Sequence, residues 1–256
     1  SNNTAVGYQA GLSNTTGAQN VFVGTQAGST NTTAFNNVAV GFKPFFGSAA
    51  VTGGSNAVVG NYALYVNTTG LNNTGIGQQV LFGNTTGSYN VAVGSNALQA
   101  NTTASENTAV GYKALYANTT GDGNTAIGVK AMDANTVGDR NVAVGADALG
   151  TMNPSSNTDM YNTAVGYQAG LAVTTGTENT LIGGLTGDAL AVGVRNVAMG
   201  KGALTSDVGG SKSVAIGHSA LENQNMGSSA TDSNNVAVGY NAGSQNTSGT
   251  DNVFVG

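Results

Sequence analysis

Cysteine and tryptophan are absent from this chain of 256 residues, and proline occurs only twice. The lack of cysteine excludes a disulfide framework and a cysteine-based zinc site. Charged residues make up only 7% of the chain, against roughly 25% in ordinary soluble domains. The seven Lys and Arg residues are scattered, so the sequence shows no basic patch for nucleic acid or an anionic membrane. It also has no long apolar run for direct membrane insertion, and we expect no signal peptide within this stretch.

A five-residue phrase, seen in Asn90-Val91-Ala92-Val93-Gly94, returns throughout the chain and closes each time on a glycine. These glycines are Gly7, Gly24, Gly41, Gly60, Gly77, Gly94, Gly111, Gly128, Gly145, Gly166, Gly183, Gly200, Gly217, Gly239 and Gly256. Eleven of the fourteen intervals between them are 17 residues, and such a period is typical of a solenoid. We therefore predict a single all-β repeat domain over residues 1–256, a parallel β-roll or β-solenoid. Because both ends fall inside the repeat, we expect a segment of a longer chain.

Aliphatic side chains occupy fixed columns within the phrase. The position before the glycine is always a large aliphatic residue, as in Val93 and Val110, and the position before that is mostly alanine. Side chains alternate across a strand, so these two columns point to opposite faces. We expect the valine column to be buried inside the coil, and the second face to pack against copies of the chain.

A second pair follows three and four residues after the glycine, as in Ala97-Leu98 and Ala114-Leu115. We interpret it as a second short strand, followed by turns rich in Asn, Thr and Gly. Each coil is then a strand, a turn, a strand and a turn. The closing glycines are expected to have backbone angles closed to other residues, or to allow close approach of two backbones.

The asparagine that opens the phrase occurs in fourteen of fifteen coils, with Ser213 as the exception. In stacked coils these amides would form a ladder of hydrogen bonds, with a structural role. We expect all charged residues, and the single histidine His218, to lie in turns and outward positions. The residues assigned to this structural repeat are represented by Asn90, Val93, Gly94, Asn107, Val110 and Gly111.

Three intervals are longer than 17 residues, with the extra residues within 47–55, 150–161 and 222–234. We expect these insertions to emerge from one edge of the stack, where repeat proteins often bind partners. Beside the first insertion lies a group of aromatic residues that we assign as candidate ligand contacts, because sugar rings stack on such surfaces. The group is Phe42, Phe45, Phe46, Tyr65 and Phe82. Packing around Pro44 is the alternative explanation for it.

The repeats beginning at Asn3, Asn107 and Asn162 share the phrase Asn-Thr-Ala-Val-Gly-Tyr. They resemble the left-handed parallel β-roll head of trimeric autotransporter adhesins of the Yersinia adhesin type, and the repeat tracts of phage tail fibres. The resemblance covers the whole chain. It implies a left-handed homotrimer that forms a structural and adhesive segment of an extracellular, cell-surface or virion fibre, which presents a surface for a host receptor or glycan.

The sequence shows no pattern typical of a catalytic or metal-binding site. His218 has no recurring partner for a nucleophilic triad, and acids such as Asp122, Asp139 and Asp251 recur too irregularly for a series of calcium sites. We expect no enzyme activity, no cofactor and no metal. Two other functions stay open. The threonine rows Thr85-Thr86, Thr102-Thr103 and Thr119-Thr120 could form an ice-binding face, and the chain could be a self-stacking extracellular filament.

Overall fold

The computed structural model describes residues 2–47 and 50–256. It is an all-β parallel β-solenoid of about 15 coils, and its described residues contain no helix. The predicted fold class is thereby confirmed. By compactness the chain divides into two units, Ser1–Asn124 and Thr125–Gly256, and the reading of residues 1–256 as one repeat domain stays a prediction.

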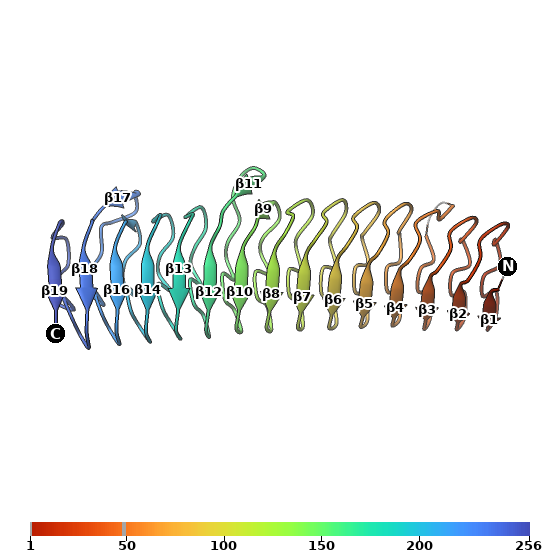
Figure 1. Cartoon of the computed structure of the whole chain (residues 1–256), viewed down its shortest axis with the longest axis horizontal. Coiled ribbons are helices and arrows are strands. Elements are labelled where there is room, and N and C mark those ends of the chain that lie inside the picture. The colour runs from red at the N-terminus through yellow and green to blue at the C-terminus, as the bar shows by residue number, and fades with distance from the viewer. Residues whose placement is uncertain (1, 48–49) are drawn as a thin grey trace. The chain divides into compact units, whose positions relative to one another are not determined.

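The described part of the first unit carries one three-residue strand in each coil, and neighbouring strands pair in parallel in chain order (Figure 1). The strands are β1 (Thr4–Val6), β2 (Val21–Val23), β3 (Val38–Val40), β4 (Ala57–Val59), β5 (Thr74–Ile76), β6 (Val91–Val93) and β7 (Thr108–Val110). The register matches equivalent positions of successive repeats, so Ala92 pairs with Ala109.

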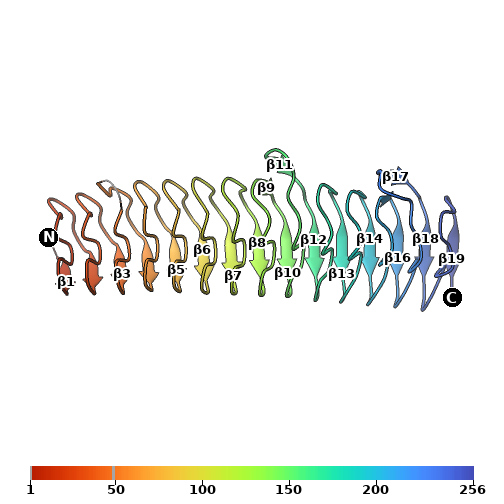
Figure 2. The same ribbon diagram turned by 180° about the vertical axis from the view of Figure 1, so that it is seen from behind.

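The second unit has the same coil. Its main strands are β8 (Thr125–Ile127), β10 (Val142–Val144), β12 (Thr163–Val165), β13 (Thr180–Ile182), β14 (Val197–Met199), β16 (Val214–Ile216), β18 (Val236–Val238) and β19 (Val253–Val255). Two smaller parallel pairs join β9 (Gly138–Asp139) to β11 (Thr158–Asp159), and β15 (Gly210–Ser211) to β17 (Thr231–Asp232). They lie in the raised loops along one edge of this unit, which are also visible from behind (Figure 2).

The orientation of the strands is opposite to the one expected. The alanine column faces the interior, where Ala92 and Ala109 are fully buried, while Ile76 of the valine column is 49% exposed. On the far side of the interior, Leu98 and Leu115 are fully buried and fill the space opposite the alanines. A coil of 17 residues encloses a narrow interior, and the pairing of a small residue with a leucine fills it. The aliphatic column therefore lies outside.

The expected second strand over the Ala-Leu pair is not formed. These residues lie in a run of turns in which every second residue has a positive φ, for example Lys113 at 56° and Leu115 at 50°. The turned backbone still bonds to the adjacent coils: Leu98 N–H donates to the carbonyl of Ala114 at 3.0 Å, and Lys113 N–H donates to that of Ser95 at 3.1 Å. Coils are thus joined by hydrogen bonds without a second strand.

Both expectations for the closing glycines are confirmed. Gly94 has a φ of +129°, and a Cβ placed there would lie 2.5 Å from the carbonyl oxygen of Gly111 in the next coil. The conformation and the close approach each exclude a side chain at this position.

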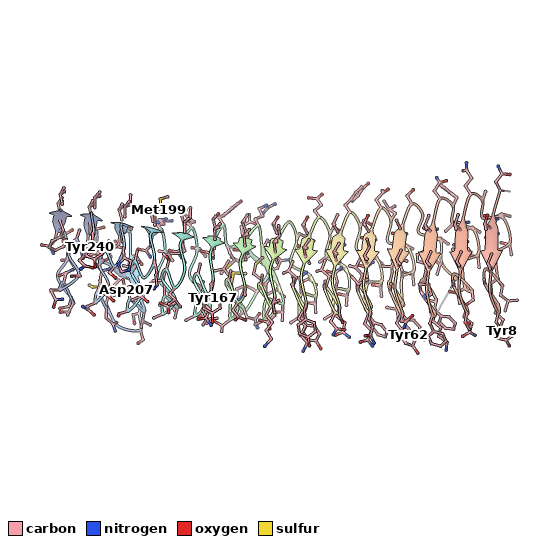
Figure 3. All side chains as sticks on the ribbon, turned by 90° about the horizontal axis from the view of Figure 1, so that it is seen from below. Tyr8, Tyr62, Tyr167, Met199, Asp207 and Tyr240 are labelled. Carbon is pink, nitrogen blue, oxygen red and sulfur yellow. The ribbon has the colours of Figure 1, made fainter. Side chains whose placement is uncertain are left out.

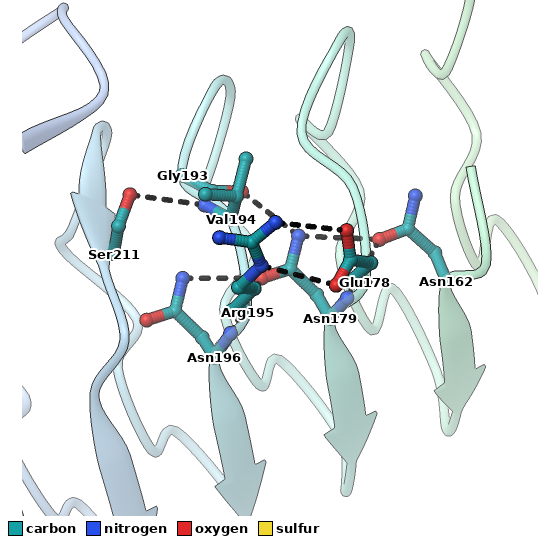
Figure 4. Close-up of polar contacts among 8 residues, drawn as sticks. All are labelled: Asn162, Glu178, Asn179, Gly193, Val194, Arg195, Asn196 and Ser211. Carbon is teal, nitrogen blue, oxygen red and sulfur yellow. Dashed lines mark hydrogen bonds and ion pairs between the residues drawn. The ribbon is translucent and has the colours of Figure 1, made fainter. Parts of the chain in front are cut away.

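The predicted asparagine ladder is also confirmed. Asn90 Nδ2 donates to Asn73 Oδ1 at 3.1 Å and to the Ala104 carbonyl at 2.9 Å, and Asn107 N–H donates to Asn90 Oδ1 at 3.1 Å. The ladder continues within the second unit, where Asn196 Nδ2 donates to Asn179 Oδ1 and Asn179 Nδ2 to Asn162 Oδ1, each at 3.1 Å (Figure 4). These amides satisfy buried polar groups in every coil they cross.

A second asparagine ladder runs through the turns of the first unit. Asn84 Nδ2 donates to Asn67 Oδ1 at 3.0 Å, and Asn101 Nδ2 donates to Asn84 Oδ1 at 2.7 Å. In the second unit the same column becomes apolar at Met152, Val173 and Leu190, which are all fully buried.

The apolar stretch of this column is followed in the second unit by a buried polar group. The Asp207 carboxylate, which lies inside the coil (Figure 3), accepts hydrogen bonds from Gly210 N–H, Gln224 Nε2 and Met226 N–H. Three donors compensate a carboxylate that is fully buried. The expectation that every charged residue lies outward is therefore wrong for Asp207, because these hydrogen bonds replace the hydration of its carboxylate.

Candidate interaction surfaces

The outer face of the main strands exposes rows of aliphatic side chains in each unit. In the first unit it displays the residues on either side of the central strand residue, including Val38, Val59, Ile76 and Val91, which are 38–49% exposed. None of the main strands contains a charged residue. A strand spacing of about 4.8 Å and a width of about 10 Å for three residues give this unit roughly 300 Å² of sheet face. This is the size at which an apolar patch on a monomer is often functional.

The second unit repeats this face. Ile127, Met199, Ile216 and Val238 are 37–40% exposed, and Met199 points away from its coil on the strand side (Figure 3). Threonines such as Thr163 and Thr180 occupy a few of the other outward positions, and valine or isoleucine occupies the rest. Such a face can bury apolar side chains against a partner without removing any charge from water.

A second candidate surface consists of aromatic rings on three coils of the first unit. Phe46 stacks on Tyr65 with ring centroids 5.3 Å apart, and Tyr65 stacks on Phe82 at 5.0 Å. Phe42 meets Tyr62 edge to face at 5.3 Å, and Tyr62 meets Tyr65 in the same way at 5.5 Å. Of the five sequence-assigned candidates, the structure therefore gathers Phe42, Phe46, Tyr65 and Phe82.

The structure removes Phe45 from the set of candidate ligand contacts and adds Tyr62. Phe45 is fully buried inside the coil, so its ring cannot contact a ligand, whereas Tyr62 lies on the surface between the other rings. The signal was present in the sequence, because Tyr62 occupies the position two after its glycine, as Lys43 does, and most other coils have a polar residue there. We name Phe42, Phe46, Tyr62, Tyr65 and Phe82 the aromatic cluster.

The two insertions of the second unit are anchored by ion pairs between adjacent coils. Arg140 pairs with Asp159 in one, and Lys212 Nζ lies 2.5 Å from Asp232 Oδ2 in the other. Met152 and Met160 of the first of these insertions are buried, and Met152 belongs to the interior column described above. The insertion at residues 47–55 includes positions 48 and 49, which lie outside the described residues.

The threonine rows have a structural use. Thr85 Oγ1 donates to the Thr102 carbonyl and Thr102 Oγ1 donates to the Thr119 carbonyl, each at 3.0 Å. Thr85 and Thr102, the first threonines of their pairs, thus use their hydroxyl groups to join neighbouring coils.

Three ion pairs on the described surface join neighbouring coils. Arg195 Nε donates to Glu178 Oε2 at 3.1 Å (Figure 4), and this hydrogen bond raises the pKa of the Arg195 guanidinium. His218 stacks against Tyr240 at 5.3 Å. Within residues 2–47 and 50–256, no three His, Asp or Glu side chains are grouped so as to hold a metal ion, and no pocket is found.

Comparison with known proteins gives no relative: no family model, no curated protein and no solved structure matches the chain. The part of the chain that the structure describes has no helix long and apolar enough to cross a membrane. The class of protein is therefore defined by the fold alone, a parallel β-solenoid.

Proposed function

We propose that this chain is a structural and adhesive segment of a fibre on a cell surface or virion, and that it has no catalytic role. The observation that carries the proposal is the uncharged outer sheet face, where Ile76 and Val59 remain half exposed although the coil interior is already filled. The aliphatic column that the sequence pattern assigned to the interior is therefore available for contacts between chains.

Self-association explains that face better than any small ligand. A flat row of Val, Ile and Thr side chains offers no pocket and no directed polar group, but it can pack against an identical row. Copies of one chain usually assemble with closed symmetry, and the likeness of the repeats to trimeric fibre proteins favours three copies. The homotrimer and an extracellular location are parts of this proposal.

The test is the mass of the purified 256-residue chain in solution. We expect multi-angle light scattering to give three times the chain mass of 25.2 kDa at micromolar concentration. The trimer should persist in 0.5 M NaCl, because apolar contacts are not screened by salt. A monodisperse monomer would contradict the proposal.

A further inference from the structure

The aromatic cluster contains more rings than the fold needs. Directly beside it, Phe45, Leu64 and Leu81 are fully buried and already fill the interior of the same three coils. The column that holds Phe46, Tyr65 and Phe82 carries other residues elsewhere in the chain. They are Leu12, Ser29, Gln99, Tyr116, Asp133, Gly150, Leu171, Asp188, Thr205, Glu222 and Ser244. Because polar residues are accepted at this position of the coil, the fold does not require an aromatic residue there.

The aromatic cluster also holds an isolated positive charge. Lys43 is the only charged residue among the first 105 residues of the chain. Its Nζ lies 5.4 Å from the centre of the Phe42 ring and 5.3 Å from that of Phe46, and it takes part in none of the ion pairs of the described residues. A cation held against two rings and without a carboxylate partner is available to an external anion.

The rings are not equally accessible to a ligand. The Tyr65 ring stacks on two neighbours: its plane makes an angle of 8° with that of Phe46 and 4° with that of Phe82. Tyr62 is stacked on neither of its neighbours, since it meets Phe42 at 85° and Tyr65 at 67°. Tyr62 and Phe42 are thus the two rings of the cluster that stack on no other ring. Because Phe42 already holds the Lys43 ammonium, Tyr62 is the ring left for the apolar face of a sugar.

Amide side chains border the same surface. Asn61 and Gln78 are exposed, and Gln99 Nε2 donates to Gln79 Oε1 at 3.4 Å. Amides can both donate to and accept from hydroxyl groups. Together with a ring and a cation, they supply the contacts that a sugar acid requires.

We propose that the aromatic cluster with Lys43 is a binding site for an acidic saccharide, with the sugar ring on Tyr62 and its carboxylate at the Lys43 ammonium. The inference rests on the adhesive part of the proposed function and names its ligand class. It does not depend on whether the sheet face self-associates, because it concerns a different side of the coil.

The experiment compares matched acidic and neutral saccharides on the full 256-residue chain by titration calorimetry and saturation-transfer NMR. The pairs are 3′-sialyllactose with lactose, and digalacturonate with its methyl ester. For at least one pair we expect the acid to bind about tenfold more tightly than its neutral partner at low ionic strength, with this preference reduced in 0.5 M NaCl. No binding of either acid, or equal binding of acid and neutral partner in both pairs, would overturn the proposal.

Three variants assign the contacts. Lys43→Gln should abolish the preference for the acid, and Tyr62→Ala should weaken the acid and its neutral partner alike. Lys130→Gln is the matched control, because Lys130 occupies the same position of its coil beside Val129 and Asp133 rather than aromatic residues. An equal effect of Lys43→Gln and Lys130→Gln would refute the site, and this comparison decides the matter even if Tyr62→Ala fails to fold. Light scattering on the same samples shows separately whether the chain is a trimer, so failure of one proposal is distinguishable from failure of the other.

Discussion

At the scale of single residues, the coil depends on positions where only glycine fits. Gly200 has a φ of +132°, and a Cβ there would lie 2.5 Å from the carbonyl oxygen of Gly217. Two residues later Gly202 also has a positive φ, of +67°, but its Cβ would meet only Ser219 Oγ, at 3.7 Å. Other coils place Gln, Lys or Tyr at the position of Gly202, so the left-handed conformation alone is tolerated.

These two glycines make a matched pair of substitutions. We expect Gly200→Ala to lower the free energy of unfolding by about 3 kcal/mol or more, since backbone strain of roughly 1–3 kcal/mol adds to a clash with rigid backbone. Gly202→Ala should change it by less than about 1 kcal/mol. Urea unfolding followed by circular dichroism measures both, and equal losses would show that close packing of coils is not what selects glycine.

The sequence predicted the glycine column and the first asparagine ladder, because each recurs at one position of the phrase. The second ladder, through Asn67, Asn84 and Asn101, has the same 17-residue spacing. It was interpreted only as a turn signal, since asparagine is common in turns. What distinguishes the two roles is burial, and these amides are fully buried.

At the scale of the coil, large and small side chains exchange places across the interior. Where the usual leucine is replaced by glycine, the alanine opposite is enlarged: Phe22 lies against Gly11 and Gly28, and Leu181 lies against Gly170 and Gly187. A Cβ on Gly187 would be 3.0 Å from Leu181 Cδ2. The pair therefore fills the volume that alanine and leucine fill elsewhere, as Ala92 and Leu98 do.

This exchange can be tested by restoring the usual pair. Leu181→Ala should cost about 2–5 kcal/mol by opening a cavity, and Gly187→Leu alone should destabilise by crowding Leu181. The double variant should regain most of the loss, because leucine at the equivalent position of other coils already has the same positive φ, as in Leu204 at 57°. Additive losses in a double-mutant cycle would show that the two positions do not share one space.

The strand pattern could not reveal which face lies inside. Alternation separates the valine column from the alanine column, but both are apolar, and the choice depends on the width of the coil. That width is set by turns in which leucine has a positive φ, as Leu98 does at 51°. Leucine rarely adopts this conformation, so sequence pattern favoured a second strand there and a wider interior.

At the scale of the whole chain, the narrow coil explains why the composition is rich in small and amide residues and poor in charge. Small residues, leucine and amides fill the interior, and Asn, Thr and Gly take part in the hydrogen bonds between coils. The charges of the described residues lie away from the outer sheet face. The aromatic cluster was only partly predictable, because the sequence placed its rings near one another but could not show that Phe45 turns inward.

The outer sheet face is where a few charges should change the behaviour of the whole chain. Ile76→Lys combined with Ile216→Lys introduces one ammonium group on this face in each unit, at side chains that are 49% and 37% exposed. The fold should tolerate both, because neither side chain points into the interior. Association should weaken at least tenfold, since an ammonium group buried between apolar faces loses its hydration without gaining a partner.

The control is Thr86→Lys combined with Thr175→Lys, which adds the same charge at exposed turn positions of the same two units. Sedimentation velocity over a concentration series compares the two double variants with the parent chain. The control should keep the parent's mass while the sheet-face variant dissociates. If both variants keep that mass, the chain associates through another surface; if both dissociate, added charge alone opposes assembly, and the exposed valines and isoleucines lose their assigned role.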